Sequence, residues 1–199
     1  SAWLGFLISL LGFHWVAFVL KEFAELPWPL AILGLVLFAF ICQPQFYLAG
    51  PTLASLERGR PARAFAGRSR VFLQALAFAA IYTAIDAILP KLFVDTLGHA
   101  FYSDRTFRQL ATLGGAPLLT FLAMSVNLAL ARLARAARDH GSLRATSSEW
   151  PWVAATLVAV TTGGLWGSAE AVRWENWLSR PESELPRVKL GVIQANIGD

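Results

Sequence analysis

Charge and sulfur are scarce in this sequence. Only 15% of its 199 residues are charged, whereas roughly a quarter are charged in an ordinary soluble domain. The chain has one cysteine and one methionine, which argues against a disulfide-bonded or metal-binding fold. That cysteine, Cys42, lies in an apolar stretch, as is typical of a small buried hydrophobe rather than of a reactive thiol. We therefore expect no metal and no cofactor.

Apolar and aromatic residues are abundant instead. Hydrophobic residues make up 56% of the chain, and its mean hydropathy is +0.51. Eight tryptophans and fourteen phenylalanines suit lipid-facing and interfacial surfaces. This composition places the chain in a lipid bilayer.

Five stretches are apolar and long enough to cross a hydrocarbon core of about 30 Å, which takes about 20 helical residues. They predict an all-α fold, a polytopic membrane helix bundle, in which Pro51 closes the second span and Pro90 follows the third. Gly114, Gly115 and Pro117 predict a kink in the fourth span. The spans lie near 2–20, 28–50, 71–89, 110–131 and 151–169.

Arginine is concentrated in two of the loops between these spans. Because excess Lys and Arg marks the cytoplasmic side, we expect loops 51–70 and 132–150 to be cytoplasmic, with 21–27, 90–109 and the C-terminal end outside. The net charge of +4 then follows from topology. We expect no nucleic-acid partner, because the first basic loop has no interleaved aromatic residue apart from Phe65. The arginines are Arg58, Arg60, Arg63, Arg68 and Arg70, then Arg132, Arg135, Arg138 and Arg144.

Two outer segments differ from the spans. Residues 91–109 mix aromatic and charged residues, which is typical of a re-entrant or interface-lying stretch and predicts a cover over a lipid-facing cavity. After the fifth span, Trp166, Trp174 and Trp177 indicate an aromatic belt at the outer head groups.

The end of the chain predicts the start of a second domain. Residues 1–178 form the expected transmembrane domain and 179–187 a polar linker. Residues 188–199 read as a buried strand, which cannot stand without neighbouring strands. The chain also starts at Ser1 without a methionine. We therefore expect it to be part of a larger protein.

A few polar residues lie within the spans. Asp86 is the only acid well inside one, and an ionisable group in lipid is a functional candidate by default. Its place near a helix end equally allows it to reach the head groups or to cap a helix. His14, beside Trp15, is a candidate for contact with a partner helix or a lipid phosphate. Gln74 and Asn127 are expected to join helices by hydrogen bonds.

Several short motifs are spread over most of the chain. The most specific is the ending, Val192-Ile193-Gln194-Ala195-Asn196-Ile197, preceded by Gly5-Phe6, Gly12-Phe13-His14-Trp15, Thr96-Leu97-Gly98, Gln109-Leu110-Ala111 with Gly114 and Gly115, and Asn127. Together they resemble the apolipoprotein N-acyltransferase family. The outer nitrilase-like domain of that family opens with an apolar strand that runs into Val-Gln-Gly-Asn-Ile, and here Ile193 and Ala195 replace its Val and Gly.

The resemblance implies an acyltransferase of the bacterial inner membrane. Its members take an acyl chain from a phospholipid donor and transfer it to the N-terminal amine of a diacylglyceryl-cysteine lipoprotein acceptor. The family's Glu-Lys-Cys triad lies in the nitrilase-like domain, so it is expected beyond Asp199, and the 199 residues alone are expected to be inactive. The family also implies two spans before the first one here. We expect a monomer.

The sequence departs from the family in one region. Where members often carry a Glu closely followed by an Arg, this chain has Asp86, and Pro90-Lys91-Leu92-Phe93 replaces the usual Phe-Pro-Trp. The departure leaves the exact substrate open and allows a divergent paralogue. A non-catalytic membrane scaffold that anchors an outer domain also fits the composition. A small-molecule transporter fits less well, since such proteins usually show paired repeats and several polar groups at mid-membrane.

Overall fold

The computed structural model describes residues 2–58, 67–91, 95–140 and 149–181, and every regular element in these ranges is helical. The all-α prediction is therefore confirmed for the described residues. The strand expected at 188–199 and most of the linker lie outside them. The elements are α1 (Ala2–Gly12), α2 (Trp15–Glu22), α3 (Trp28–Ile41), α4 (Gln45–Arg58), α6 (Gly67–Ile88), η1 (Leu97–Phe101), η2 (Phe107–Leu110), α7 (Ala111–His140) and α8 (Trp150–Leu178).

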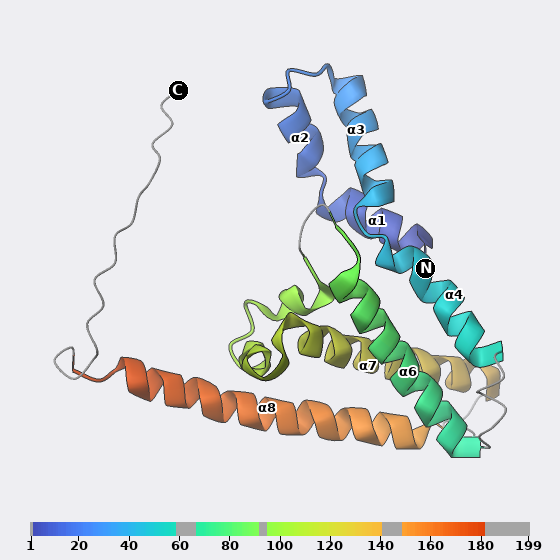
Figure 1. Ribbon diagram of the computed structural model, residues 1–199, viewed down its shortest axis with the longest axis vertical. Coiled ribbons are helices and arrows are strands. Elements are labelled where there is room, and N and C mark those ends of the chain that lie inside the picture. The colour runs from blue at the N-terminus through green and yellow to red at the C-terminus, as the bar shows by residue number, and fades with distance from the viewer. Residues whose placement is uncertain (1, 59–66, 92–94, 141–148, 182–199) are drawn as a thin grey trace.

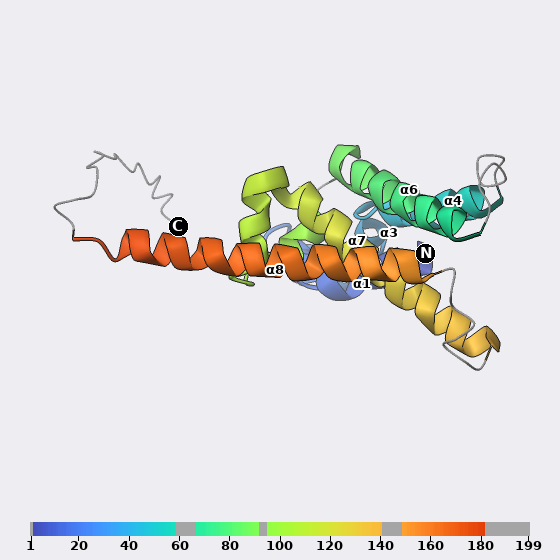
Figure 2. The same ribbon diagram turned by 90° about the horizontal axis from the view of Figure 1, so that it is seen from below.

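The helices form two groups that α4 connects (Figure 1). In one group α1 and α2 both pack against α3, and in the other α6, α7 and α8 pack together. Helix α4 leaves the first group and contacts α6 of the second. The C-terminal part of α8 projects beyond the other helices, as Figures 1 and 2 both show.

The first predicted span is bent rather than straight. Helices α1 and α2 meet at an angle of 52° across a short break. Gly12 ends α1, and glycine weakens a helix because its backbone loses more freedom than that of other residues. His14 Nδ1 donates a hydrogen bond to the Leu11 carbonyl oxygen at 3.0 Å, which satisfies an acceptor that the break leaves open. The span predicted near 2–20 is thus made of two helices joined at a bend.

The second predicted span is also broken, and it is longer than expected. Helix α3 ends at Ile41, and α4 begins at Gln45 after a break that contains Pro44. The prediction that Pro51 closes this span is wrong, because Pro51 lies inside α4, which continues to Arg58. Proline removes one helical hydrogen bond, but α4 packs along α6, and the Gln74 side chain donates to the Leu56 carbonyl at 2.8 Å.

The fourth predicted span carries the kink expected of its glycines. Helix α7 is interrupted at Gly114 and Gly115, where Gly115 adopts a φ of +65°. Side chains disfavour this backbone conformation, so glycine is required there. Pro117 follows within one helical turn. Beyond the expected end at 131, α7 continues to His140. The first arginines of the predicted loop, Arg132, Arg135 and Arg138, therefore lie within the helix.

Small and aromatic side chains fill the core between α6, α7 and α8. Its α6 members are Ala75, Phe78 and Ala79, of which the two alanines let the neighbouring helices approach closely. Phe72 packs edge-on to Trp152 with ring centroids 5.7 Å apart. At the start of α8, Glu149 pairs with Arg132 of α7 at 3.1 Å. This core fixes α6 and α7, whose ends on one side carry the polar cluster described below.

Three described helical segments are long and apolar enough to cross a membrane. They are Trp28–Arg58, Ser69–Ile88 and Phe107–Arg135, and the bent pair α1 and α2 makes a fourth if it counts as one span. In the most apolar stretch of each segment, only about a third of the residues are buried within the protein. The other residues of these stretches are available to contact lipid. Helix α8 is long enough but is not apolar enough to be counted with these segments, since threonine, glycine and serine interrupt its apolar residues. The count of five spans thus stays a prediction.

Candidate functional site

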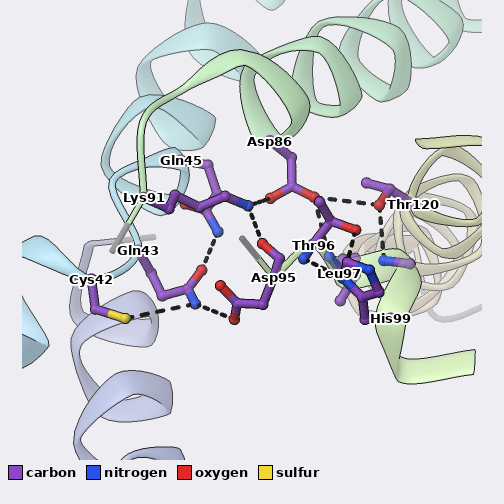
Figure 3. A network of polar contacts seen from close by, with 11 residues as sticks. Cys42, Gln43, Gln45, Asp86, Lys91, Asp95, Thr96, Leu97, His99 and Thr120 are labelled. Atoms are coloured by element: carbon purple, nitrogen blue, oxygen red, sulfur yellow. Dashed lines mark hydrogen bonds and ion pairs between the residues drawn. The ribbon is translucent and has the colours of Figure 1, made fainter. Parts of the chain in front are cut away.

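A network of polar side chains lies where α3 and α4, the end of α6, η1 and α7 meet (Figure 3). Asp86, near the end of α6, is at its centre and is only 1% exposed. One carboxylate oxygen accepts from Lys91 Nζ at 3.0 Å, and the other accepts from the backbone N–H of Leu97 at 3.1 Å and from Thr120 Oγ1 at 3.3 Å. Asp86 is thus both a buried anchor and a cap on the first residue of η1.

Lys91 completes the central ion pair. Its side chain is 4% exposed, and its ammonium group also donates to the backbone carbonyl of Asp95. A buried ion pair is tolerated when further hydrogen bonds satisfy both partners, and Asp86 and Lys91 each have such bonds. The sequence singled out Asp86 but not Lys91, because a lysine just after a predicted span is usual.

Thr120 joins η1 to α7. Its hydroxyl accepts from the Gly98 backbone N–H at 2.8 Å while donating to Asp86. A side chain at Gly98 would collide with the Ala116 carbonyl oxygen, so glycine is needed for this close approach. The Thr96-Leu97-Gly98 motif therefore has a physical role, which is to seat η1 against α7.

Thr96 and His99 fix the start of η1 in a capping box. The Thr96 backbone N–H donates to His99 Nδ1 at 2.9 Å. Because this nitrogen accepts the bond, the ring is in the tautomer that carries its proton on Nε2. Asp86 and the Thr96–His99 capping box together fix the start of η1 in the outer segment.

Two glutamines and a second acid extend the network toward α1. Gln43 Nε2 donates to Asp95 Oδ2 at 3.0 Å, and Gln43 Oε1 accepts from Gln45 Nε2. Gln43 and Gln45 are 6% and 2% exposed. Sequence reasoning missed both, although the Gln-Pro-Gln interruption of an apolar run at 43–45 could have indicated them.

A small cleft of about 200 Å³ opens beside this extension. Three buried polar atoms in its walls have no hydrogen-bond partner in the described part of the chain: Asp95 Oδ1, Gln45 Oε1 and the Tyr82 hydroxyl. Apolar and aromatic side chains form much of the rest. The lining residues are Ile8, Gln43, Gln45, Phe46, Tyr82, Asp95, Thr96, Leu97 and Ala100.

The outer segment predicted at 91–109 is packed over α7 and α8. Helix η1 contacts α7, and η2 contacts both α7 and α8. Phe101 and Phe107, with ring centroids 5.9 Å apart, border an apolar cleft of about 270 Å³ that Leu119, Val126 and Val160 also line. The described part of the segment therefore covers a largely apolar cleft.

The other predicted residues lie apart from the network. His14 and Trp15 are exposed at the bend between α1 and α2, where Trp15 is 44% exposed. Gln74 joins α6 to α4, which confirms the prediction for that residue. Asn127 instead donates to Ala123 within its own helix at 2.8 Å, so its expected link to another helix is wrong. Asparagine here satisfies a carbonyl one turn back, a common local bond.

Cys42 is fully buried, as predicted. It is 0% exposed and packs with Ala17, Leu35 and Phe38 between α2 and α3. Gln43 Nε2 lies 4.0 Å from its sulfur. In the described part of the chain, no histidine or carboxylate forms a hydrogen bond with this thiol that could activate it as a nucleophile.

Comparison with known proteins gives two matches. The sequence model described as the apolipoprotein N-acyltransferase N-terminal domain matches residues 1–129. A curated apolipoprotein N-acyltransferase from Bdellovibrio bacteriovorus is 26% identical over 207 residues, which cover 100% of this chain and 34% of that relative. The chain thus spans about a third of the relative's length. No solved structure matches the chain.

The family match covers every element that contributes to the polar network. Helices α1 to α4 and α6, both outer turns and the kinked part of α7 lie within residues 1–129. The matched residues are well over half of the chain. From this match and the helical, apolar fold, we conclude that the chain belongs to the apolipoprotein N-acyltransferase family.

Proposed function

We propose that this chain is the membrane part of an enzyme that N-acylates lipoproteins. The acyl donor is a phospholipid, and the acceptor is the N-terminal amine of a diacylglyceryl-cysteine lipoprotein. The thiolate of a Glu-Lys-Cys triad attacks the donor ester and releases a lysophospholipid. The acceptor amine then attacks the thioester, which yields an amide and frees the thiolate.

The observation that carries this proposal is the family match over residues 1–129. The named relative supports it along the full length of the chain, although the chain covers 34% of that relative. We therefore extend the activity of a whole family member to a chain that matches only part of one. The sequence departs from the family pattern at Asp86 and Lys91. These two residues form a buried ion pair with each other, so the departures leave the packing of the membrane part intact.

The membrane helices suit substrates that are themselves anchored by acyl chains. Moving such a chain into water costs about 0.8 kcal/mol for each CH₂ group. An enzyme that meets both substrates in the bilayer avoids this cost. We place the protein in the bacterial inner membrane, with the N-terminal end of the chain cytoplasmic, and its C-terminal end periplasmic, since the arginine-rich loops 51–70 and 132–150 are then inside.

In this orientation the polar network lies near the outer leaflet. Asp86, Lys91 and Thr120 hold η1 against α7, and the aromatic residues of η1 and η2 border an apolar cleft. We assign this outer segment a role in lateral lipid entry. His14 and Trp15, exposed at the α1–α2 bend, remain candidates for lipid contact.

The chemistry itself is assigned to residues beyond Asp199. Cys42 is a poor nucleophile here, since it is fully buried among apolar side chains and a thiolate is disfavoured in such surroundings. The 199-residue chain is accordingly expected to bind lipid without reacting with it.

The test is acyl transfer by the full-length protein in lipid nanodiscs. A phospholipid with an isotopically labelled acyl chain is incubated with a diacylglyceryl-cysteine peptide, and the peptide is weighed by mass spectrometry. We expect its mass to increase by one labelled acyl chain at the N-terminus, while an N-acetylated control peptide stays unchanged. A folded protein that leaves the free-amine peptide unmodified would contradict the proposal.

A further inference from the structure

The small cleft beside Gln43 and Gln45 has an uncompensated negative charge. Lys91 is the only cation within hydrogen-bond distance of either acid among the described residues, and its ion pair is with Asp86. Among the described residues, Asp95 receives only the neutral amide of Gln43 on Oδ2, and its buried Oδ1 has no partner. Two acids and one lysine leave one negative charge. A half-buried carboxylate without an ion-pair partner calls for a positive group beside it.

The unpartnered atoms in the same walls specify what kind of cation fits. Asp95 Oδ1 and Gln45 Oε1 can only accept hydrogen bonds, and the Tyr82 hydroxyl can accept or donate one. Gln45 and Tyr82 are each 2% exposed. A ligand with several N–H donors would satisfy all three atoms, whereas a quaternary ammonium group has no N–H to donate.

The rest of the cleft fits an ammonium group attached to a short carbon chain. Phe46 and Tyr82 place aromatic rings in the wall, with centroids 6.2 Å apart, and such rings attract cations. Ile8, Leu97 and Ala100 supply apolar surface for the adjoining methylenes. A metal ion fits less well, because calcium takes 6–8 oxygen ligands, and no group of three or more potential metal-binding side chains was found in the described residues.

We infer that this cleft binds a primary ammonium group, with Asp95 as its counter-charge and Gln45 and Tyr82 as hydrogen-bond partners. Two sources of this group are compatible with the cleft: the ethanolamine head group of a phospholipid and the free N-terminal amine of the lipopeptide acceptor. Only this choice of sources rests on the proposed function. Ammonium binding itself requires no acyl transfer.

The experiment measures binding to the full-length protein in detergent by isothermal titration calorimetry. The lipid arm compares dihexanoyl phosphatidylethanolamine with dihexanoyl phosphatidylcholine, which differ in the N–H donors of the head group. The peptide arm compares a free-amine diacylglyceryl-cysteine peptide with its N-acetylated form. We expect at least one free-amine probe to bind about tenfold more tightly than its blocked partner, and the arm in which this occurs identifies the source.

Matched variants test the assignment to this cleft. Asp95→Asn keeps the shape and removes the charge, so it should weaken binding of the preferred probe about tenfold. Tyr82→Phe should weaken it about threefold. Glu57→Gln makes the same change of charge at the exposed end of α4, outside the outer segment, and Tyr47→Phe removes the hydroxyl of a tyrosine that is not among the residues lining the cleft. Both variants should bind as the wild type does.

A further readout separates a ligand site from a structural acid. Asp95→Asn should unfold at the wild-type temperature or above it when no amine is present, because it removes a half-buried charge that has no ion-pair partner. If Asp95→Asn fails to fold, the wild-type probe comparison and Tyr82→Phe decide. Equal binding of free and blocked amines, or full binding by both cleft variants, would overturn the inference and leave a water-filled cleft. Binding with no acylation would contradict the proposed function alone.

Discussion

Asp86 and Lys91 form a buried ion pair at the end of a membrane helix, and replacing Asp86 tests how much this pair contributes to the stability of the protein. Asp86→Leu leaves the Lys91 ammonium, 4% exposed, without a counter-charge, and breaking a buried pair in this way costs about 3–5 kcal/mol. Asp86→Asn keeps the shape and part of the hydrogen bonding, so it should do less harm. Thermal unfolding of the full-length protein in detergent measures both.

The paired variant Asp86→Leu with Lys91→Met provides the control for charge. It removes both ions, so it should recover part of the stability that Asp86→Leu loses. Wild-type unfolding temperatures for both single variants of Asp86 would mean that the carboxylate is already solvated, and Asp86 would then leave the list of site residues.

At the scale of single residues, the sequence predicted Asp86 but not its partners. An acid within an apolar run stands out, because charge in lipid is costly. Lys91 and Asp95 lie in the predicted outer segment, where polar residues are ordinary, and Gln43 lies inside the predicted second span but carries no charge. The contact between Gln43 and Asp95 joins residues 52 positions apart, and no local pattern encodes such a distance. Burial of Cys42 was predictable from its apolar neighbours alone.

At the scale of elements, Thr120 holds η1 on α7, and Thr120→Val removes this contact while keeping the side-chain shape. The Gly98 N–H then loses its acceptor and Asp86 loses a donor. A buried group left unpaired costs about 1–3 kcal/mol. We expect faster amide hydrogen exchange, measured by mass spectrometry, in peptides that cover 97–101, with no change in the middle of α6.

Thr112→Val is the matched control for this prediction. Its hydroxyl donates to the Gln109 carbonyl at 2.8 Å in an exposed position near the start of α7, away from Asp86. Its effect on exchange at 97–101 should be small. Equal exchange in wild type and Thr120→Val would show that packing alone seats η1.

Helix positions were predictable from apolar runs, but their breaks were predictable only in part. The kink at Gly114 and Gly115 followed from residues that favour it, and the end of α6 followed from Pro90. Helix α6 starts earlier than predicted, at Gly67, so that Arg70, expected before the span, lies inside the helix. Pro51 misled the prediction, because the tertiary contact of α4 with α6 outweighs the loss of one hydrogen bond. The bend after Gly12 depends on how α1 and α2 both pack on α3, which the sequence of the span alone does not reveal.

At the scale of the whole molecule, the arginine distribution predicts which ends of the helices are cytoplasmic. Cysteines introduced at Ser55 and Ser183, in a background with Cys42→Ala, report this to a membrane-impermeant thiol reagent on cells with a permeabilised outer membrane. Ser55 is exposed at the basic end of α4. We expect labelling at position 183 and none at 55 until the inner membrane is opened.

The reverse pattern would overturn the topology and, with it, the placement of the polar network near the outer leaflet. Labelling at both positions in intact cells would contradict an odd number of crossings between them. The two outcomes differ in what they reject, because an odd number of crossings holds under either orientation.

The central claim is that the described helices receive lipid while the chemistry belongs to residues beyond Asp199. The most direct measurement incubates the 199-residue chain and the full-length protein, side by side in nanodiscs, with labelled phospholipid and then searches for acyl adducts by intact and peptide mass spectrometry. We predict a thioester on the full-length protein outside residues 1–199 and no adduct on the 199-residue chain. A thioester on Cys42 in either protein would contradict the account.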